Sequence, residues 1–120
     1  MRVPTATVKR MPDPGDRRSQ RSFLREIREF VKGSHRPQLI IDLSRVEQLS
    51  PESIDLLLEC VDHAERGDGE VFVAGASDQA AVILELTQMT SVLDLFPSVA
   101  EATQGCQIHG SESTTPLHAA

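Results

Sequence analysis

The sequence predicts an α/β domain, with a small, mostly parallel sheet of about four strands covered by about four helices. The first observation is the apolar run Leu39–Leu43, which only Asp42 interrupts. Such a run is typical of a strand buried on both faces, because that strand has no polar face. The second is the alternation of strand-like and helix-like segments, which favours parallel pairing through right-handed crossovers. A chain of 120 residues is long enough for one core.

The first 16 residues predict an irregular segment with room for one edge strand, near residues 5–8. Two prolines and a glycine in the stretch 11–16 break either kind of backbone ladder. A helix is expected over 17–32, because apolar and charged side chains separate onto two faces and Gly33 is a natural end. The apolar face holds Phe23, Leu24, Ile27, Phe30 and Val31. The folded domain is therefore expected over 17–104.

Ser50 and Pro51 mark the start of a second helix, expected over about 51–65. A serine side chain caps an orphan amide, and proline in the first helical position gives up an N–H that has no partner. Glu52 puts a negative charge in the first turn, where it suits the helix dipole. Leu56 falls off the apolar stripe, so it is either partly buried or a contact for a docking protein. The stripe consists of Ile54, Leu57, Leu58 and Val61.

The remainder of the chain predicts strands over 70–74 and 92–96 and two further helices. Ser77 or Asp78 is expected to cap the third helix, which would reach about Thr90. Ser98 followed by Glu101 fits a capping box for a short last helix ending at residue 104. Residues 105–120 are small and polar and predict a disordered tail. The inward side chains of the third helix would be Val82, Ile83, Leu86 and Met89.

Charge and hydropathy exclude several classes of function. A net charge of −6 argues against nucleic-acid binding, which needs a basic face. No apolar run approaches ~18 residues, so membrane insertion is not expected. The amino terminus has no apolar signal core, which favours a cytoplasmic protein.

Nothing in the sequence favours catalysis, a cofactor or a metal. There is no Gly-x-Ser-x-Gly elbow and no phosphate-binding glycine loop. The pairs Cys60/His63 and Cys106/His109 share a spacing, but zinc needs four converging ligands, and a buried cysteine beside a surface histidine explains the first pair. Asp42 is expected to bond loop amides rather than to act in a carboxylate pair. We therefore expect a protein that is not an enzyme.

Residues 40–46, with the sequence IIDLSRV, resemble a strand end of STAS domains, the family of sulfate-transporter tails and bacterial anti-sigma-factor antagonists. The family pattern there is Val, then Ile or Val, then Asp-Leu-Ser-x-Val. A tetrad of Asp, two Ser or Thr, and Gly follows in the family, and it falls here on residues 50–53. The position that the family's kinases phosphorylate is therefore Glu52, and the family glycine is Ser53. The resemblance covers roughly residues 8–104.

The resemblance implies a regulator that binds a protein, like an anti-sigma-factor antagonist in bacterial partner switching. In the family, the loop and helix at the phosphosite dock onto a serine kinase that also holds a sigma factor, and phosphorylation blocks docking. Glu52 would fix a negative charge there, with Ser53 and Ser50 as substitute phosphoacceptors. Two other roles stay open: a STAS subunit that braces the ATPase of a lipid or solute ABC-type transport system, and a STAS scaffold; a homodimer is also open. The expected partner-binding residues are Ser44, Arg45, Gln48, Ser50, Pro51, Glu52, Ser53, Asp55 and Leu56.

Overall fold

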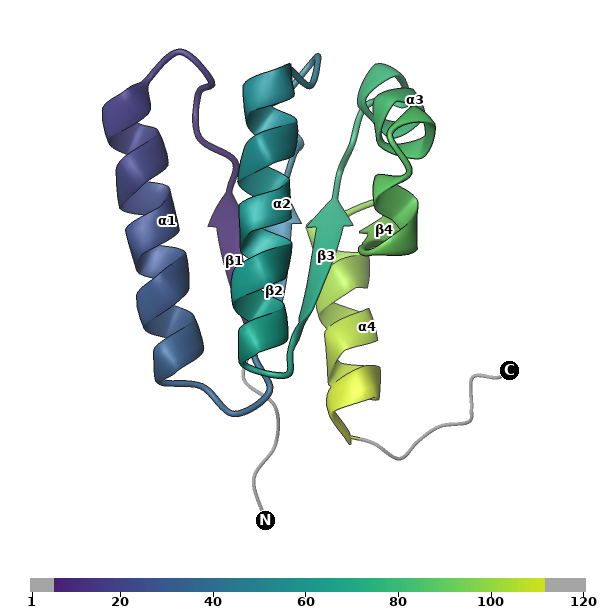
Figure 1. Ribbon diagram of the computed structural model, residues 1–120. Coiled ribbons are helices and arrows are strands. Elements are labelled where there is room, and N and C mark those ends of the chain that lie inside the picture. Colours follow the sequence, from purple (N-terminus) through teal and green to yellow (C-terminus); the bar gives the residue numbers. More distant parts are fainter. Residues whose placement is uncertain (1–5, 112–120) are drawn as a thin grey trace.

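Four parallel strands form the frame of the molecule (Figure 1). The computed structural model describes residues 6–111, and the side chains of residues 6–105. The strand order is β1-β2-β3-β4, and each neighbouring pair is parallel. The prediction of an α/β fold with a mostly parallel sheet is confirmed. The strands are β1 (Ala6–Arg10), β2 (Gln38–Asp42), β3 (Glu70–Ala74) and β4 (Asp94–Phe96).

Helices cover both faces of this sheet. Because the strand order is sequential and crossovers between parallel strands are right-handed, the three connecting helices lie on one face. Figure 1 shows the first two of them side by side in front of the strands. The last helix packs on the other face. The helices are α1 (Arg17–Lys32), α2 (Pro51–Arg66), α3 (Asp78–Leu86) and α4 (Val99–Ser111), with a 3-10 turn, η1 (Met89–Ser91), after α3.

β2 is buried on both faces, as its apolar run predicts. Leu39 and Ile41 belong to the larger core cluster, which the sheet shares with α1, α2 and α3. Ile40 points the opposite way, into a smaller cluster with Phe72 and with Ala102 of α4. This alternation follows from the two-residue period of a strand, so one strand supplies both cores.

The amino-terminal edge strand is complete over five residues. β1 pairs with all of β2, from Ala6 beside Gln38 to Arg10 beside Asp42. The strand predicted near residues 5–8 therefore exists at 6–10, and residue 5 lies outside the described part of the chain. An irregular segment follows, and the carboxylate of Asp16 then caps α1 by accepting from the N–H groups of Arg18 and Ser19. The hydroxyl of Ser19 also donates to Asp16, and these hydrogen bonds lower the pKa of Asp16.

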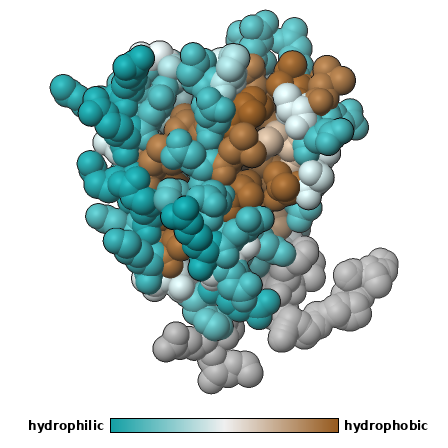
Figure 2. Space-filling model, in the orientation of Figure 1, coloured by the Kyte–Doolittle hydropathy of each residue, from teal (hydrophilic) through white to brown (hydrophobic). Residues whose placement is uncertain are grey.

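The prediction for the third helix was wrong in its end and in two of its four inward side chains. Met89 is buried and Ile83 packs against the core, as predicted. α3 ends at Leu86 rather than at Thr90, because Gln88 takes a left-handed conformation with φ of 62°. Val82 and Leu86 are 50% and 74% exposed, and the buried positions are instead Ala80 and Leu84. The five consecutive residues 80–84 of this nine-residue helix are all apolar, so the periodicity of apolar residues could not select the inward face. Figure 2 shows the resulting hydrophobic area on the α3 side of α2.

The last helix and the last strand also differ from their predictions. α4 runs to Ser111, so the predicted end of this helix at residue 104, with a tail from residue 105, is wrong. Residues 112–120 lie outside the described part of the chain. A Cβ at Gly105 would come within 2.7 Å of the Phe96 ring, which shows how closely α4 approaches the sheet there. Tertiary packing of this kind sustains a helix of weak intrinsic propensity. β4 is shorter than the predicted 92–96, because the N–H groups of Val92 and Leu93 donate to the carbonyl of Met89 in η1 instead of to a neighbouring strand.

Candidate functional site

The candidate site lies at the sheet edge where the carboxyl ends of the strands meet, which is the upper edge in Figure 1. The β2–α2 connection, residues 43–50, lies there beside the β3–α3 connection, residues 75–77. Ser77 joins them, because its hydroxyl donates to the carbonyl of Glu47 at 2.9 Å and accepts from the N–H of Ala80 at 3.1 Å. The residue that caps α3 therefore also holds the loop that precedes α2.

A glycine allows the two connections to approach each other. Gly75 has φ of 74°, and a Cβ on it would lie 3.1 Å from the Cβ of Ser44. Both the left-handed backbone and the close approach favour glycine. Ser44 is held from the other side by Asp42, whose carboxylate accepts from its N–H at 2.9 Å. The prediction that Asp42 bonds a loop amide is confirmed.

The first turn of α2 buries Ser53 and exposes Glu52, while the cap residue Ser50 is half-buried. The hydroxyl of Ser50 accepts from the N–H of Ser53 at 3.2 Å, and Pro51 follows in the first helical position, as predicted. The two serine hydroxyl oxygens lie 3.2 Å apart, and Ser53 is fully buried. Glu52 is exposed in the same turn. A phosphate on Ser53 would require this turn to open, whereas Glu52 is accessible to a partner.

Three helices begin at this edge, because each connecting helix starts where its strand ends. Their amino termini carry partial positive charge, and each has a carboxylate of its own. Asp16 caps α1, while Glu52 and Asp78 lie in the first turns of α2 and α3. Each helix amino terminus at this edge therefore already has a carboxylate beside it and is not a vacant site for an anion.

A groove of about 470 Å³ separates the first turns of α1 and α2. Its α1 side carries Arg17 and Arg21, and its α2 side carries Glu52 and Asp55. Within the described residues, no ion pair of 4.0 Å or less crosses it. The sequence interpretation did not include the α1 residues, although the parallel order of β1 and β2 brings both helix starts to one edge.

The structure reverses the predicted roles of two leucines in α2. Leu56 was expected off the apolar stripe, but it is 5% exposed and lines the groove toward α1. Leu58 was expected on the stripe, but it is 45% exposed. Leu56 faces the long helix α1, whereas Leu58 faces the side where the short α3 leaves α2 open. Of the other expected contact residues, six are exposed, namely Ser44, Arg45, Gln48, Pro51, Glu52 and Asp55.

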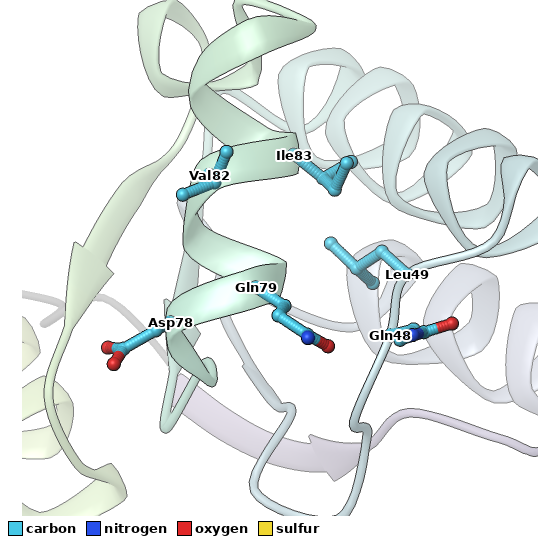
Figure 3. Close-up of a pocket in the computed structure, with 6 residues that line it drawn as sticks. All are labelled: Gln48, Leu49, Asp78, Gln79, Val82 and Ile83. Carbon is cyan, nitrogen blue, oxygen red and sulfur yellow. The ribbon is translucent and has the colours of Figure 1, made fainter.

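A second groove, of about 430 Å³, lies between the β2–α2 connection and α3 (Figure 3). Leu49 and Ile83 point toward one another across it, and Gln48 and Gln79 lie at one end. Only Gln48 of these was expected at a binding surface. The missing signal was again topological, since the sheet edge that holds residues 43–50 also holds the start of α3.

Cys60 is buried in α2 and is a free thiol. Burial, with a smaller contribution from the charge of Glu59, raises the pKa of Cys60 to about 12. Such a thiol is inert at neutral pH, as expected for a core residue. The side chains of Cys106 and His109 lie outside the described part of the chain.

Comparison with known proteins identifies the family. A crystal structure of TM1081, a candidate anti-sigma factor antagonist from Thermotoga maritima, has a TM-score of 0.65 at 14% identity and covers 75% of this chain and 77% of that chain. The NMR structure of TM1081 has a TM-score of 0.69 at 15% identity, with coverages of 85% and 82%. At these identities the likeness shows the fold. No curated protein matches the chain. Within residues 6–111, no helix combines the length and apolar character needed to cross a membrane. The family model of the STAS domain matches residues 3–102, and the chain belongs to the STAS domain family.

Proposed function

We propose that this STAS domain is a non-enzymatic, protein-binding regulator of the anti-sigma-factor-antagonist kind, with a fixed negative charge where the family carries its phosphoacceptor. The observation that carries the proposal is the first turn of α2, where Glu52 is exposed and Ser53 is fully buried. The hydroxyl of Ser50 is engaged as the helix cap. A charge that other members gain by phosphorylation is supplied here by the sequence.

The surface around Glu52 suits a protein partner. Ser44, Arg45 and Gln48 are exposed on the β2–α2 connection, next to Pro51 and Glu52. The hydrogen bonds of Ser77 and Asp42 hold this connection in place before any partner arrives. A pre-ordered loop loses less conformational entropy on binding, which supports a docking role.

A glutamate reproduces only part of a phosphate. It carries one negative charge, where a phosphoserine carries up to ~2 and has more acceptor oxygens. A kinase-like anti-sigma factor that rejects the phosphorylated form of an antagonist would therefore bind this chain with reduced affinity. The regulator would then act by its concentration rather than by its phosphorylation state.

A second role is favoured by the same turn. A STAS subunit of a lipid or solute ABC-type transport system, which braces an ATPase subunit, needs no phosphorylation cycle. The burial of Ser53 and its contact with Ser50 agree with that role.

Calorimetric titration of the purified chain into two partners from the same organism separates the roles. One partner is a kinase-like anti-sigma factor, and the other is a transporter ATPase subunit. We expect binding to the anti-sigma factor, with release of its sigma factor, and loss of that binding in Arg45→Glu at the exposed loop. Arg28→Glu, on the exposed face of α1, is the matched control and should bind normally. Binding to the ATPase subunit alone would overturn the proposal.

A further inference from the structure

An exposed hydrophobic surface lies between α2 and the segment formed by α3 and η1 (Figure 2). Five large hydrophobic side chains are strongly exposed in the described part of the chain. Three of them belong to α2 and α3, and a fourth, Val92, directly follows η1. The fifth, Val8, is on β1. We name this surface the α2–α3 groove. Its exposed side chains are Leu58, Val82, Leu86 and Val92, at 45%, 50%, 74% and 44% exposure.

The groove shares side chains with two cavities, because Val82 lines one of them and Val92 lines the other. At the upper end of the α2–α3 groove is the cavity of about 430 Å³ described above as the second groove, which Leu49 and Ile83 line (Figure 3). At its lower end, Val61 and Val92 line a cavity of about 280 Å³ between α2 and η1. Leu58 lies between these ends, because it is three residues before Val61 on the same side of α2. The groove stays open because α3 is only nine residues long and ends at Leu86.

The charged side chains that line the two cavities are all acidic. Asp78 is the charged residue that lines the upper cavity, and Glu65, Glu70 and Asp94 line the lower one. This agrees with the whole charge distribution. Residues 38–105 contain 13 acidic residues (Asp or Glu) and 2 basic residues (Lys or Arg). Residues 6–37 contain 4 acidic and 9 basic residues. The apolar surface therefore lies within the acidic part of the molecule.

We propose that the α2–α3 groove binds a basic amphipathic helix of a partner protein. The apolar side chains of such a helix, at i, i+3, i+4 and i+7, fit a groove flanked by helices, and its Lys and Arg side chains fit the acidic rim. A two-fold pairing with a second copy of this chain would instead oppose two acidic rims. The inference deepens the proposed function and rests on it for the class of partner, a protein.

The test uses a synthetic helical peptide with leucines at i, i+3, i+4 and i+7 and lysines at its other positions, titrated into ¹⁵N-labelled full-length chain. We expect amide shifts confined to α2, α3, η1 and the residues between them, and weaker binding as salt is raised. The double variant Leu58→Gln, Leu86→Gln should weaken binding about tenfold or more. Val8→Gln, at a comparably exposed valine on β1, should leave it unchanged. A matched peptide with glutamates in place of lysines should bind the wild-type chain more weakly than the lysine peptide does.

Three results of the peptide titration would overturn the inference. They are shifts centred on α1 or on α4, equal affinity for the lysine and glutamate peptides, and unchanged affinity in the double variant. A concentration-dependent dimer that the double variant abolishes would also overturn it, in favour of a second copy as the occupant.

The outcome is separable from that of the proposed function, because the peptide reports on the groove and not on Glu52. If the peptide fails while the anti-sigma factor still binds, the groove inference falls alone. If the peptide binds in the groove and no anti-sigma factor binds, the proposed function falls and the groove inference stands.

Discussion

Leu56 and Leu58 of α2 give opposite predictions for one substitution. Leu56 is 5% exposed in the main core cluster, and Leu58 is 45% exposed. Truncation of a buried leucine to alanine costs about 2–5 kcal/mol, because the transfer energy of the lost atoms adds to the energy of the cavity. Truncation of a half-exposed leucine leaves no closed cavity and should cost about 1 kcal/mol or less.

Urea unfolding followed by circular dichroism measures both variants. Leu56→Ala should lower the free energy of unfolding by about 3 kcal/mol, which is a large share of the roughly 5–15 kcal/mol typical of a domain. Leu58→Ala should keep the wild-type midpoint within about 1 kcal/mol. Equal slopes with denaturant would show that the two variants unfold the same amount of surface.

Equal losses in the two variants, or a greater loss in Leu58→Ala, would refute the burial assignment. The orientation of α2 would then follow the apolar stripe expected from the sequence, with Leu56 facing solvent. The α2–α3 groove would also lose one of its exposed side chains.

Two further predictions concern Gly75 and Cys60. Gly75→Ala should lower the free energy of unfolding by about 1–3 kcal/mol, because of the left-handed backbone and the contact with Ser44. The control Gly33→Ala, at φ of −94°, should change the thermal midpoint little. Equal thermal midpoints for the two variants would argue against backbone strain at position 75. Burial raises the pKa of Cys60 from 9.0 to about 12, so the unfolded chain releases this proton first and stability should fall as pH rises from about 9 to about 12. Cys60→Ala should lack that component of the alkaline loss, and an identical pH profile would contradict it. Mass spectrometry should also find Cys60 unmodified by iodoacetamide at pH 8 in the native chain.

Features that depend on local chemistry could be predicted from the sequence. Three predictions of this kind are confirmed, because each depends on a few neighbouring residues. They are the buried strand β2, the serine caps at Ser50 and Ser98, and the end of α1 at Gly33. Ser77 was one of two candidates for the cap of α3, and its hydroxyl accepts from the N–H of Ala80.

Features that depend on distant neighbours could not be predicted in this way. Leu56 and Leu58 differ because a long helix flanks α2 on one side and a short one on the other, and the sequence of α2 contains neither fact. α4 extends past residue 104 because it packs against Phe96, although its own residues favour a helix weakly. Packing of this kind overrides local preference.

The candidate site shows the same division. Its β2–α2 connection and Glu52 were found from the residues themselves. The side chains that complete its two grooves, such as Arg21 on α1 and Gln79 on α3, come from elements whose positions only the strand order fixes.

The most direct test of the central claim is the dissociation constant for the kinase-like anti-sigma factor, measured for Glu52→Gln and for its control Glu101→Gln. Both glutamates are exposed in the first turn of a helix, so either change removes a similar dipole interaction, worth about 0.3–1 kcal/mol of stability. Only Glu52 lies at the proposed docking surface. Glu52→Gln should bind about tenfold more tightly, from a gain of about 1–3 kcal/mol, while Glu101→Gln binds like the wild type. An unchanged dissociation constant for Glu52→Gln, with the same small loss of thermal stability in both variants, would contradict the fixed-charge account.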